Sequence, residues 1–452
     1  MTEFDPRSSH SVVGNVVMEA SAMSCSKTSL HAPSLLRVLR VAIGAAILMA
    51  ATANAENWPQ WRGPLGTGQS AEKNLPLKWS AETGENIRWK ATLPGSGMSS
   101  PIVWGDRVFL TQALDPAGKQ RALMCFSRKD GKLQWQKVTE YAEKESTYAG
   151  EPHYCSASPA TDGERVVASF GSAGLVCYDL QGKLLWQRDL GKAEQLWGNA
   201  SSPIIYQNLV IQNFGPGERT FLIAVDKKTG RDAWKIDVPG GKYGTAPSEW
   251  TGSWSTPVIH RVAGKDELLL SWPETLKAYD PRSGKELWSC RGMGKLVYGS
   301  PLTSPDAVVA MSGFGGPSLA VKTGGAGDIT DSHRLWHDPK QQPQRVGSGV
   351  IVGDHVYILN ATGIAQCINL KSGQVVWAER AGTGAWGSMV HADGRLYVTN
   401  QRGETVVLAA KPTFELLATN PLGERSQSSP AFSDGDIFIR TYGHLWCVSA
   451  RK

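Results

Sequence analysis

Eleven side chains that could bind a ligand occur in one kind of place, the loops that lead into a repeated strand start. Those starts read Ser-Pro, Thr-Pro or Gly-Ser, as in SSPIIY from Ser201 and STPVIH from Ser255. The loops offer aromatic rings for stacking and cation–π contacts, and imidazole, amide and guanidinium groups for hydrogen bonds. They supply His153, Tyr154, Trp197, Asn199, Trp250, Trp254, Tyr298, Arg345, Trp386, Arg425 and Gln427. This chemistry suits a flat ligand that is anionic or carries carbonyl groups. The alternative is that the rings only pack on one another.

Groups that could hold a metal ion are scarce in the same loops. Asn199 and Glu249 are the nearest candidates for a hard cation, with Glu151 and Glu424 as further ones, and each is as readily a solvated loop residue. No spacing of Cys and His matches a zinc site, and no CxxCH haem-attachment sequence is present. The sequence therefore predicts no metal site, and it singles out no catalytic residue.

A recurring β-hairpin must position these loops. Its clearest copy is AYDPRSGKELW from Ala278 to Trp288, and AVDKKTGRDAW from Ala224, CINLKSGQVVW from Cys367 and CFSRKDGKLQW from Cys125 repeat it. Each copy has a small residue on an apolar strand, a turn Gly, and a second strand that ends in Trp. We interpret the recurring Trp as a packing residue and the small residue, often Cys, as part of the core.

The strand starts recur at nearly regular intervals. From Pro101 to Pro430 there are seven intervals in 329 residues, an average of 47, which is typical of a four-stranded propeller blade. The last unit lacks a closing Trp, whereas an orphan strand, Glu85 to Leu93, places Trp89 where such a Trp belongs. We therefore expect an all-β, eight-bladed β-propeller over residues 85–452, closed by the N-terminal strand. The first strand of each blade then lines the axis, so the candidate loops gather at one mouth of the channel.

The beginning of the chain reads as a targeting segment. Arg37 and Arg40 precede an apolar run from Val41 to Ala53, which is too short to span a bilayer and ends in a small-residue cleavage pattern. Residues 1–55 are therefore expected to be a long leader with a signal peptide, and residues 56–84 an N-terminal extension. We expect export across the inner membrane to the periplasm or cell envelope, with no transmembrane anchor after cleavage. The net charge of +6 is scattered along the units, which argues against nucleic-acid binding.

The hairpin pattern small-x-Asp-x-x-(Thr/Ser)-Gly-x-x-x-Trp resembles the pyrroloquinoline quinone (PQQ) repeat of the quinoprotein alcohol dehydrogenase-like superfamily. The resemblance covers most of the chain from about Glu85, and the opening NWPQWRGPLGTG, from Asn57 to Gly68, is similar to that of many uncharacterised exported bacterial members. It implies a propeller whose blades are locked by Trp residues between neighbours. It does not imply one chemistry, because the family contains both quinone-dependent dehydrogenases and non-catalytic scaffolds.

Two functions follow from the resemblance. The first is a non-catalytic binding or scaffolding protein whose partners are envelope proteins or a small flat anionic ligand. The alternative is a PQQ-dependent dehydrogenase that oxidises an alcohol or sugar at the channel mouth. PQQ itself suits the aromatic loops. The calcium-dependent dehydrogenases, however, carry an adjacent Cys-Cys pair and carboxylate ligands, and no two cysteines are neighbours here. We therefore favour the binding protein.

Overall fold

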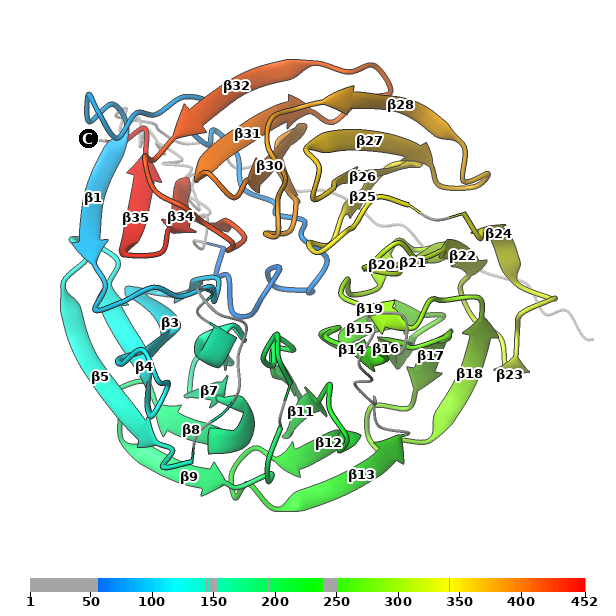
Figure 1. The fold of residues 1–452 in the computed structure, drawn as a ribbon, viewed down its shortest axis with the longest axis horizontal. Helices are drawn as coiled ribbons and strands as arrows, with labels where there is room; N and C mark the ends of the chain where they lie inside the picture. The colour runs from blue at the N-terminus through cyan, green and yellow to red at the C-terminus, as the bar shows by residue number, and fades with distance from the viewer. Residues whose placement is uncertain are drawn as a thin grey trace, which may run out of the picture. The chain divides into compact units, whose positions relative to one another are not determined.

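Eight antiparallel sheets surround a central axis in a computed structural model that describes residues 56–143, 145, 151, 153–193, 195–238, 250–340 and 342–451. The fourth strands form the rim of the ring, as β5, β13, β28 and β1 show in Figure 1. This confirms the predicted eight-bladed propeller of four-stranded blades. The predicted leader and Glu249 lie outside the described residues. No helix in the described part of the chain is long and apolar enough to cross a membrane.

The strands of blades 1 to 4 follow the chain in order. Blade 1 holds β2 (Ile102–Trp104), β3 (Arg107–Ala113), β4 (Gln120–Ser127) and β5 (Leu133–Glu140). Blade 2 holds β6 (Ala160–Thr161), β7 (Arg165–Ser169), β8 (Leu175–Asp179) and β9 (Leu184–Arg188). Blade 3 holds β10 (Ile204–Tyr206), β11 (Leu209–Phe214), β12 (Thr220–Asp226) and β13 (Asp232–Val238). Blade 4 holds β15 (Val258–Val262), β16 (Lys265–Trp272), β17 (Thr275–Tyr279) and β18 (Glu286–Arg291), with β23 (Gly327–Asp328) along its outer edge.

Blades 5 to 8 repeat the arrangement. Blade 5 holds β20 (Leu302–Thr303), β21 (Ala307–Met311), β22 (Ser318–Lys322) and β24 (Arg334–Asp338). Blade 6 holds β25 (Val350–Val352), β26 (His355–Leu359), β27 (Ile364–Asn369) and β28 (Val375–Arg380). Blade 7 holds β29 (Val390–Ala392), β30 (Arg395–Thr399), β31 (Glu404–Ala409) and β32 (Leu416–Pro421). Blade 8 holds β33 (Ala431–Ser433), β34 (Asp436–Arg440), β35 (His444–Ser449) and β1 (Ile87–Thr92). Outside the blades lie the parallel pair β14 (Gly252–Ser253) and β19 (Leu296–Val297), and the 3-10 turns η1 (His153–Cys155) and η2 (Gly171–Ala173).

The closing Trp of each hairpin lies directly opposite its small residue. Ala278 pairs with Trp288 in blade 4, for example, and Cys367 with Trp377 in blade 6. The indole then reaches the turn of the next blade. A Cβ added to the turn glycine Gly284, whose φ is +72°, would lie 2.7 Å from the Trp234 ring of the blade before. Only Gly combines this φ with so close an approach, which explains why the turn Gly and the Trp recur together.

Blade 7 departs from the repeat. The sequence alignment assigns Leu417 to the closing position, but Val407 pairs with Ala418, so the assignment to Leu417 is wrong by one residue. No Trp fills this place, and Phe414 instead packs edge-on against Trp377 of blade 6, with ring centroids 5.2 Å apart. Phe414 thus packs on the closing Trp of the preceding blade, where a turn Gly meets that Trp in other blades.

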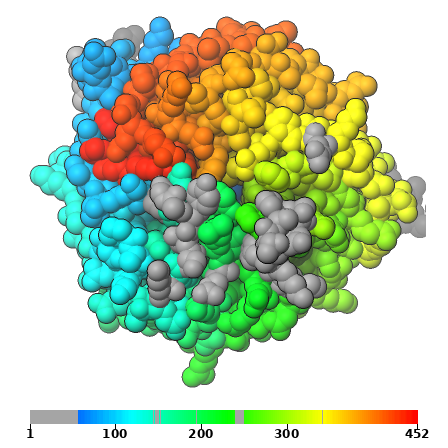
Figure 2. All heavy atoms as spheres, viewed as in Figure 1, coloured from blue at the N-terminus to red at the C-terminus, as the bar shows by residue number. Residues whose placement is uncertain are grey.

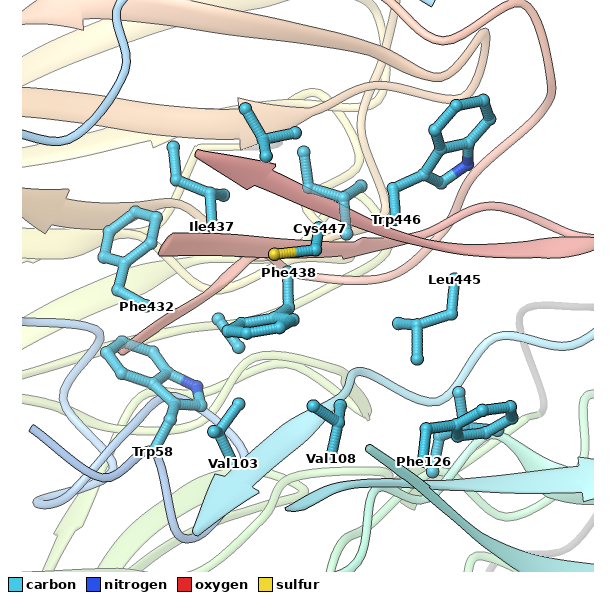
Figure 3. Close-up of a cluster of buried hydrophobic side chains, with 14 of the residues drawn as sticks. Trp58, Val103, Val108, Phe126, Phe432, Ile437, Phe438, Leu445, Trp446 and Cys447 are labelled. Atoms are coloured by element: carbon cyan, nitrogen blue, oxygen red, sulfur yellow. The ribbon is translucent and has the colours of Figure 1, made fainter. Parts of the chain in front are cut away.

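Blade 8 takes its outer strand from the N-terminal side of the chain. β1 pairs antiparallel with β35, and Trp89 stands opposite Cys447, in the register of the other Trp–small pairs. The Trp89 indole donates to the Arg128 carbonyl at 2.8 Å, which carries the contact on to blade 1. Figure 3 shows the apolar core at this junction, where Phe438 and Cys447 of blade 8 face Val103 and Val108 of blade 1.

The extension ahead of β1 lies across the ring. Trp58 pairs with Val103 in the first strand of blade 1, and the Pro59 carbonyl accepts from Thr161 of blade 2. Gly68 accepts from His391 of blade 7. The buried Arg62 guanidinium donates to the Gly349 carbonyl of blade 6 at 2.5 Å. Figure 1 shows this blue segment over the middle of the ring.

Candidate functional site

A closed circle of hydroxyl groups surrounds the channel. Each blade has a Ser or Thr just ahead of its first strand, and the backbone N–H of that residue donates to the side-chain oxygen of its equivalent in the next blade. An inner-edge N–H has no further strand to pair with, so the hydroxyl satisfies it. The bonds run from Ser100 to Ser158 (2.8 Å), Ser158 to Ser202 (2.9 Å), Ser202 to Thr256 (3.0 Å), Thr256 to Ser300 (2.9 Å), Ser300 to Ser348 (3.0 Å), Ser348 to Ser388 (2.9 Å), Ser388 to Ser429 (2.8 Å) and Ser429 to Ser100 (2.8 Å).

A cavity of about 460 Å³ occupies the channel beside this circle. Its size falls within the range of small-molecule sites. The face of the ring appears in Figure 2, where the blades follow one another around the centre from cyan through green and yellow to red. The described lining residues are Trp61, Met98, Ser100, His153, Ser156, Ser158, Trp197, Ala200, Ser202, Trp250, Trp254, Thr256, Leu296, Tyr298, Phe314, Gln344, Val346, Trp386, Ser388, Gln427 and Ser429.

Aromatic rings from several loops form the walls. Trp197, ahead of blade 3, meets Trp386, ahead of blade 7, with ring centroids 6.3 Å apart. Loops from opposite sides of the ring therefore touch across the channel. Trp254 lies edge-on to Tyr298 at 5.1 Å and donates from Nε1 to the Gly198 carbonyl at 3.0 Å, so its indole is held in place. Burial raises the pKa of Tyr298 to about 12, which keeps its hydroxyl neutral.

His153 is the one imidazole in the described lining. It lies in the turn η1, is 3% exposed, and packs edge-on against Trp197 at 5.7 Å. Burial lowers the pKa of His153 to about 4, against a smaller opposite effect of the Glu151 carboxylate. The ring is therefore neutral at physiological pH, and its buried Nε2 has no hydrogen-bond partner among the described residues.

The depressed pKa of His153 predicts a pH-dependent stability. Between the ordinary pKa of 6.5 and the folded value of about 4, the unfolded chain binds a proton that the folded chain does not. Stability should therefore fall as pH drops through this window, by on the order of 2 kcal/mol from pH 7 to pH 5. Denaturant unfolding of the parent and of His153→Gln at both pH values checks this. The variant should lose less stability than the parent on acidification, and an equal loss in both would contradict the assignment.

Glu151 ties its loop to blade 8. Its carboxylate accepts from Arg425 Nη2 at 3.0 Å, Gln427 Nε2 at 3.1 Å and Tyr442 Oη at 2.6 Å. Burial alone would raise the pKa of Glu151, but hydrogen bonds, first from Tyr442 and then from Arg425, outweigh burial and lower it. The carboxylate is thus charged and already engaged on both oxygens.

A second proposed cation ligand, Glu424, is engaged in the same way. It accepts from Thr441 Oγ1, from the Gly443 N–H at 2.8 Å and from His444 Nδ1 at 2.9 Å. Asn199 differs: it donates from Nδ2 to the Gly215 carbonyl, and its buried Oδ1 has no partner among the described residues. Across the described ranges, no group of three or more His, Cys, Asp or Glu side chains is arranged to hold a metal ion.

Seven of the eleven predicted site residues line the cavity: His153, Trp197, Trp250, Trp254, Tyr298, Trp386 and Gln427. The other four lie elsewhere. Asn199 and Tyr154 line a separate void of about 20 Å³. Arg345 is buried and donates to Gln366 Oε1 at 3.1 Å and to Gln342 Oε1 at 3.3 Å. Arg425 pairs with Glu151 and covers the Tyr442 ring at 5.0 Å.

Other lining residues were not predicted. Trp61 comes from the extension, and Met98 and Phe314 come from segments that the loop pattern did not single out. Leu296 lies in the candidate loop that also carries Tyr298, but it was not named as a site residue. The hydroxyl circle did leave a signal. A Ser or Thr stands at the same place in all eight starts, before a Pro in six of them, and was interpreted only as a small residue.

Comparison with known proteins agrees with this architecture. A family profile described as outer membrane protein assembly factor BamB matches residues 69–235 and 218–452, most of the chain. The chain belongs to this family. No curated protein matches the sequence.

Solved structures share the fold of this BamB-family chain at low identity. BamB from Moraxella catarrhalis is 13% identical with a TM-score of 0.56, over 80% of this chain and 96% of that one. The quinohemoprotein alcohol dehydrogenase from Comamonas testosteroni is 12% identical with a TM-score of 0.63, over 87% and 80%. The quinohemoprotein alcohol dehydrogenase ADHIIG from Pseudomonas putida HK5 is 12% identical with a TM-score of 0.58, again over 87% and 80%. The chain is thus a PQQ-repeat propeller, similar in fold to both classes.

The described residues of this BamB-family propeller do not fit PQQ with calcium. The cavity is large enough and aromatic enough for a flat molecule. PQQ, however, carries several carboxylates, and buried carboxylates need cationic or strong hydrogen-bonding partners. No Lys or Arg stands in the described lining, and both arginines expected to serve a ligand lie outside it. The carboxylates that could have held calcium, Glu151 and Glu424, are engaged by the protein.

Proposed function

We propose that this chain is a non-catalytic binding protein of the periplasm or cell envelope, and that its central cavity is the binding site. The observation that carries this proposal is the chemistry of the lining. It consists of aromatic, apolar, hydroxyl and amide side chains and one imidazole, with no Asp, Glu, Lys or Arg among the described residues. General acid–base catalysis calls for a group with a pKa near the working pH. The pKa of His153 lies at about 4 and that of Tyr298 at about 12.

The family supports the envelope assignment. Its profile is named for an outer membrane protein assembly factor, and BamB from Moraxella catarrhalis shares the fold over most of its length. The predicted signal peptide agrees with export. Envelope proteins are therefore the proposed macromolecular partners. A flat anionic ligand finds less support, because Arg345 and Arg425 donate to other residues outside the cavity.

The alternative function is a PQQ-dependent dehydrogenase. The fold shared with two quinohemoprotein alcohol dehydrogenases favours it. Fold similarity at 12% identity does not carry the chemistry over, so the choice has to be made by experiment.

A quinone-loading experiment separates the two functions. The purified protein is incubated with PQQ and calcium chloride, passed through gel filtration, and assayed for alcohol and sugar oxidation with a dye as electron acceptor. We expect no quinone absorbance in the protein peak and no dye reduction above a protein-free control. Quinone that co-elutes with the protein and supports dye reduction would establish the dehydrogenase and overturn the binding-protein proposal.

A further inference from the structure

We propose that the cavity binds a neutral saccharide, with a sugar ring stacked on the tryptophan walls and its hydroxyl groups bonded to the Ser/Thr circle. This inference rests on the proposed function, which it deepens by naming the ligand class. Four features of the cavity carry it: its hydrogen-bond donors, its acceptors, its aromatic walls, and its closure on one side.

The circle presents hydroxyl donors that no other described residue accepts. All eight side chains are at most 5% exposed, and each oxygen accepts a backbone N–H from the neighbouring blade. A hydroxyl that accepts in this way still has a hydrogen to donate. None of the eight donates to another described residue. Six of them line the cavity: Ser100, Ser158, Ser202, Thr256, Ser388 and Ser429. The lining therefore offers a set of donors to ligand oxygen atoms.

Acceptors stand beside these donors. Gln427 donates from Nε2 to Glu151, which leaves its buried Oε1 without a partner among the described residues. The buried Nε2 of neutral His153 is likewise unpaired there, and it accepts or donates according to the tautomer of the ring. A buried polar atom without a partner costs roughly 1–3 kcal/mol, so a ligand that pairs with it gains affinity. Sugar hydroxyls both donate and accept, and they can use both kinds of group at once.

The walls select against charge. Indole faces carry partial negative charge, which disfavours an anion, and no cationic side chain in the described lining offsets this. A quaternary ammonium would suit the rings but could not accept from the hydroxyl donors. A sugar ring presents C–H groups on its faces and oxygens on its edge. It therefore matches aromatic faces and hydroxyl donors together, without burying an unpaired charge.

The extension limits what can enter. Trp58 pairs with Val103, which lies beyond Ser100 along the inner edge of blade 1 and away from the candidate loops. Trp61, three residues later, lines the cavity, and Arg62 is buried against blade 6. A segment of this chain therefore lies across the channel on the side away from those loops. This arrangement suits a compact ligand rather than a polypeptide threaded through the ring.

Binding is measured by titrating the purified protein with glucose, N-acetylglucosamine, maltose and cellobiose, using tryptophan fluorescence and calorimetry. Choline chloride, and PQQ with calcium, are the comparison ligands. We expect at least one saccharide to bind saturably and to change the fluorescence. Trp386→Ala should weaken that binding by about fivefold, because a stacked ring contributes about 1 kcal/mol. Trp377→Ala is the matched control: it removes the same side chain from β28, outside the cavity, and should leave the affinity unchanged.

Phe314→Ala is a second lining variant, which tests the inference even if Trp386→Ala does not fold. Phe314 lines the cavity but is 55% exposed, so its removal should leave the fold intact while weakening saccharide binding. The inference is overturned if none of the four saccharides binds to the folded protein, or if both lining variants bind as the parent does. Choline binding in place of a saccharide would also overturn it, while leaving the non-catalytic binding protein in place. Only PQQ retention with dye reduction would overturn the proposed function as well.

Discussion

Removal of residues 56–93 is expected to leave the protein aggregated or unfolded. The deletion takes away β1 and with it Trp89, the Trp that stands opposite Cys447 in blade 8. It also removes Trp58 and Trp79, which are 1% and 3% exposed. Loss of a buried Trp side chain costs about 3–5 kcal/mol, whereas a domain is stable by only about 5–15 kcal/mol. The remaining edge of β35 would be unpaired and open to association. Solubility, circular dichroism and a thermal melt measure the effect.

Two single substitutions test the same closure without a deletion. Trp89→Ala should lower the melting temperature by many degrees, because its indole bridges blade 8 and the Arg128 carbonyl of blade 1. Trp377→Ala alters the equivalent position of blade 6, where the sheet is continuous in the chain and the indole bond to the Lys411 carbonyl is longer, 3.3 Å. It should cost less. A truncated protein that melts with the parent, or equal losses in the two variants, would contradict the closure.

The fold could be predicted because each repeat encodes the same local structure. A small residue, a turn Gly and a Trp specify one hairpin, and Ala278 with Trp288 realises it directly. Repetition then makes each copy a check on the others. The predicted closing position was wrong where the pattern was absent. Blade 7 lacks the turn Gly and the Trp, so no residue type marks the position opposite Val407, and Ala418 rather than Leu417 occupies it.

The site was less predictable, because it depends on contacts between blades. Placing a residue in a mouth loop does not say which way its side chain points. Trp386 lines the cavity, but Arg345, which lies between the lining residues Gln344 and Val346, turns away to Gln366. The hydroxyl circle was visible in the sequence as a repeated Ser or Thr. That these residues bond to one another could be seen only in the closed ring, because the Ser429 N–H donates to Ser100 Oγ, 329 residues away in the chain.

The two arginines of the candidate loops bear on the choice of ligand. Their place in the sequence does not show whether they face the cavity, whereas their hydrogen-bond partners do. Arg425 is held by Glu151 at 3.0 Å, and Arg345 by two glutamines. Arg425 is thus paired with a carboxylate. Arg345 keeps its charge, and its buried Nε and Nη1 have no partner among the described residues, but it does not line the cavity. Neither guanidinium therefore lies where it could bind an anion in the cavity. What remains for a ligand is the neutral chemistry of indole, hydroxyl and amide groups.

Substitution of Arg440 should strongly destabilise the junction of blades 8 and 1. Arg440 ends β34 and is fully buried. Its Nη1 donates to Ser99 Oγ at 2.6 Å and to the Thr111 carbonyl at 2.7 Å, and its Nη2 donates to Gln112 Oε1 at 2.5 Å. Burial lowers the pKa of Arg440 to about 10, so it stays charged at neutral pH. One side chain of the last blade thus satisfies three acceptors of the first.

Arg440→Met keeps an unbranched apolar stem, is shorter than Arg, and removes every donor. Breaking a buried charged network typically costs about 3–5 kcal/mol, which is a large share of the stability of a domain. Denaturant unfolding should show this loss. Arg425→Met is the matched control, because its guanidinium is about half exposed and its ion pair with Glu151 is worth at most about 1 kcal/mol.

A second variant tests the same contact from the segment ahead of blade 1. A Cβ on Gly97 would lie 1.6 Å from Arg440 Nη2, so Gly97→Ala should displace the guanidinium and also destabilise the protein. If Arg440→Met and Arg425→Met unfold at the same denaturant concentration, the guanidinium does not join the two blades. The ring would then be held closed by the pairing of β1 with β35 and by the apolar core of Figure 3.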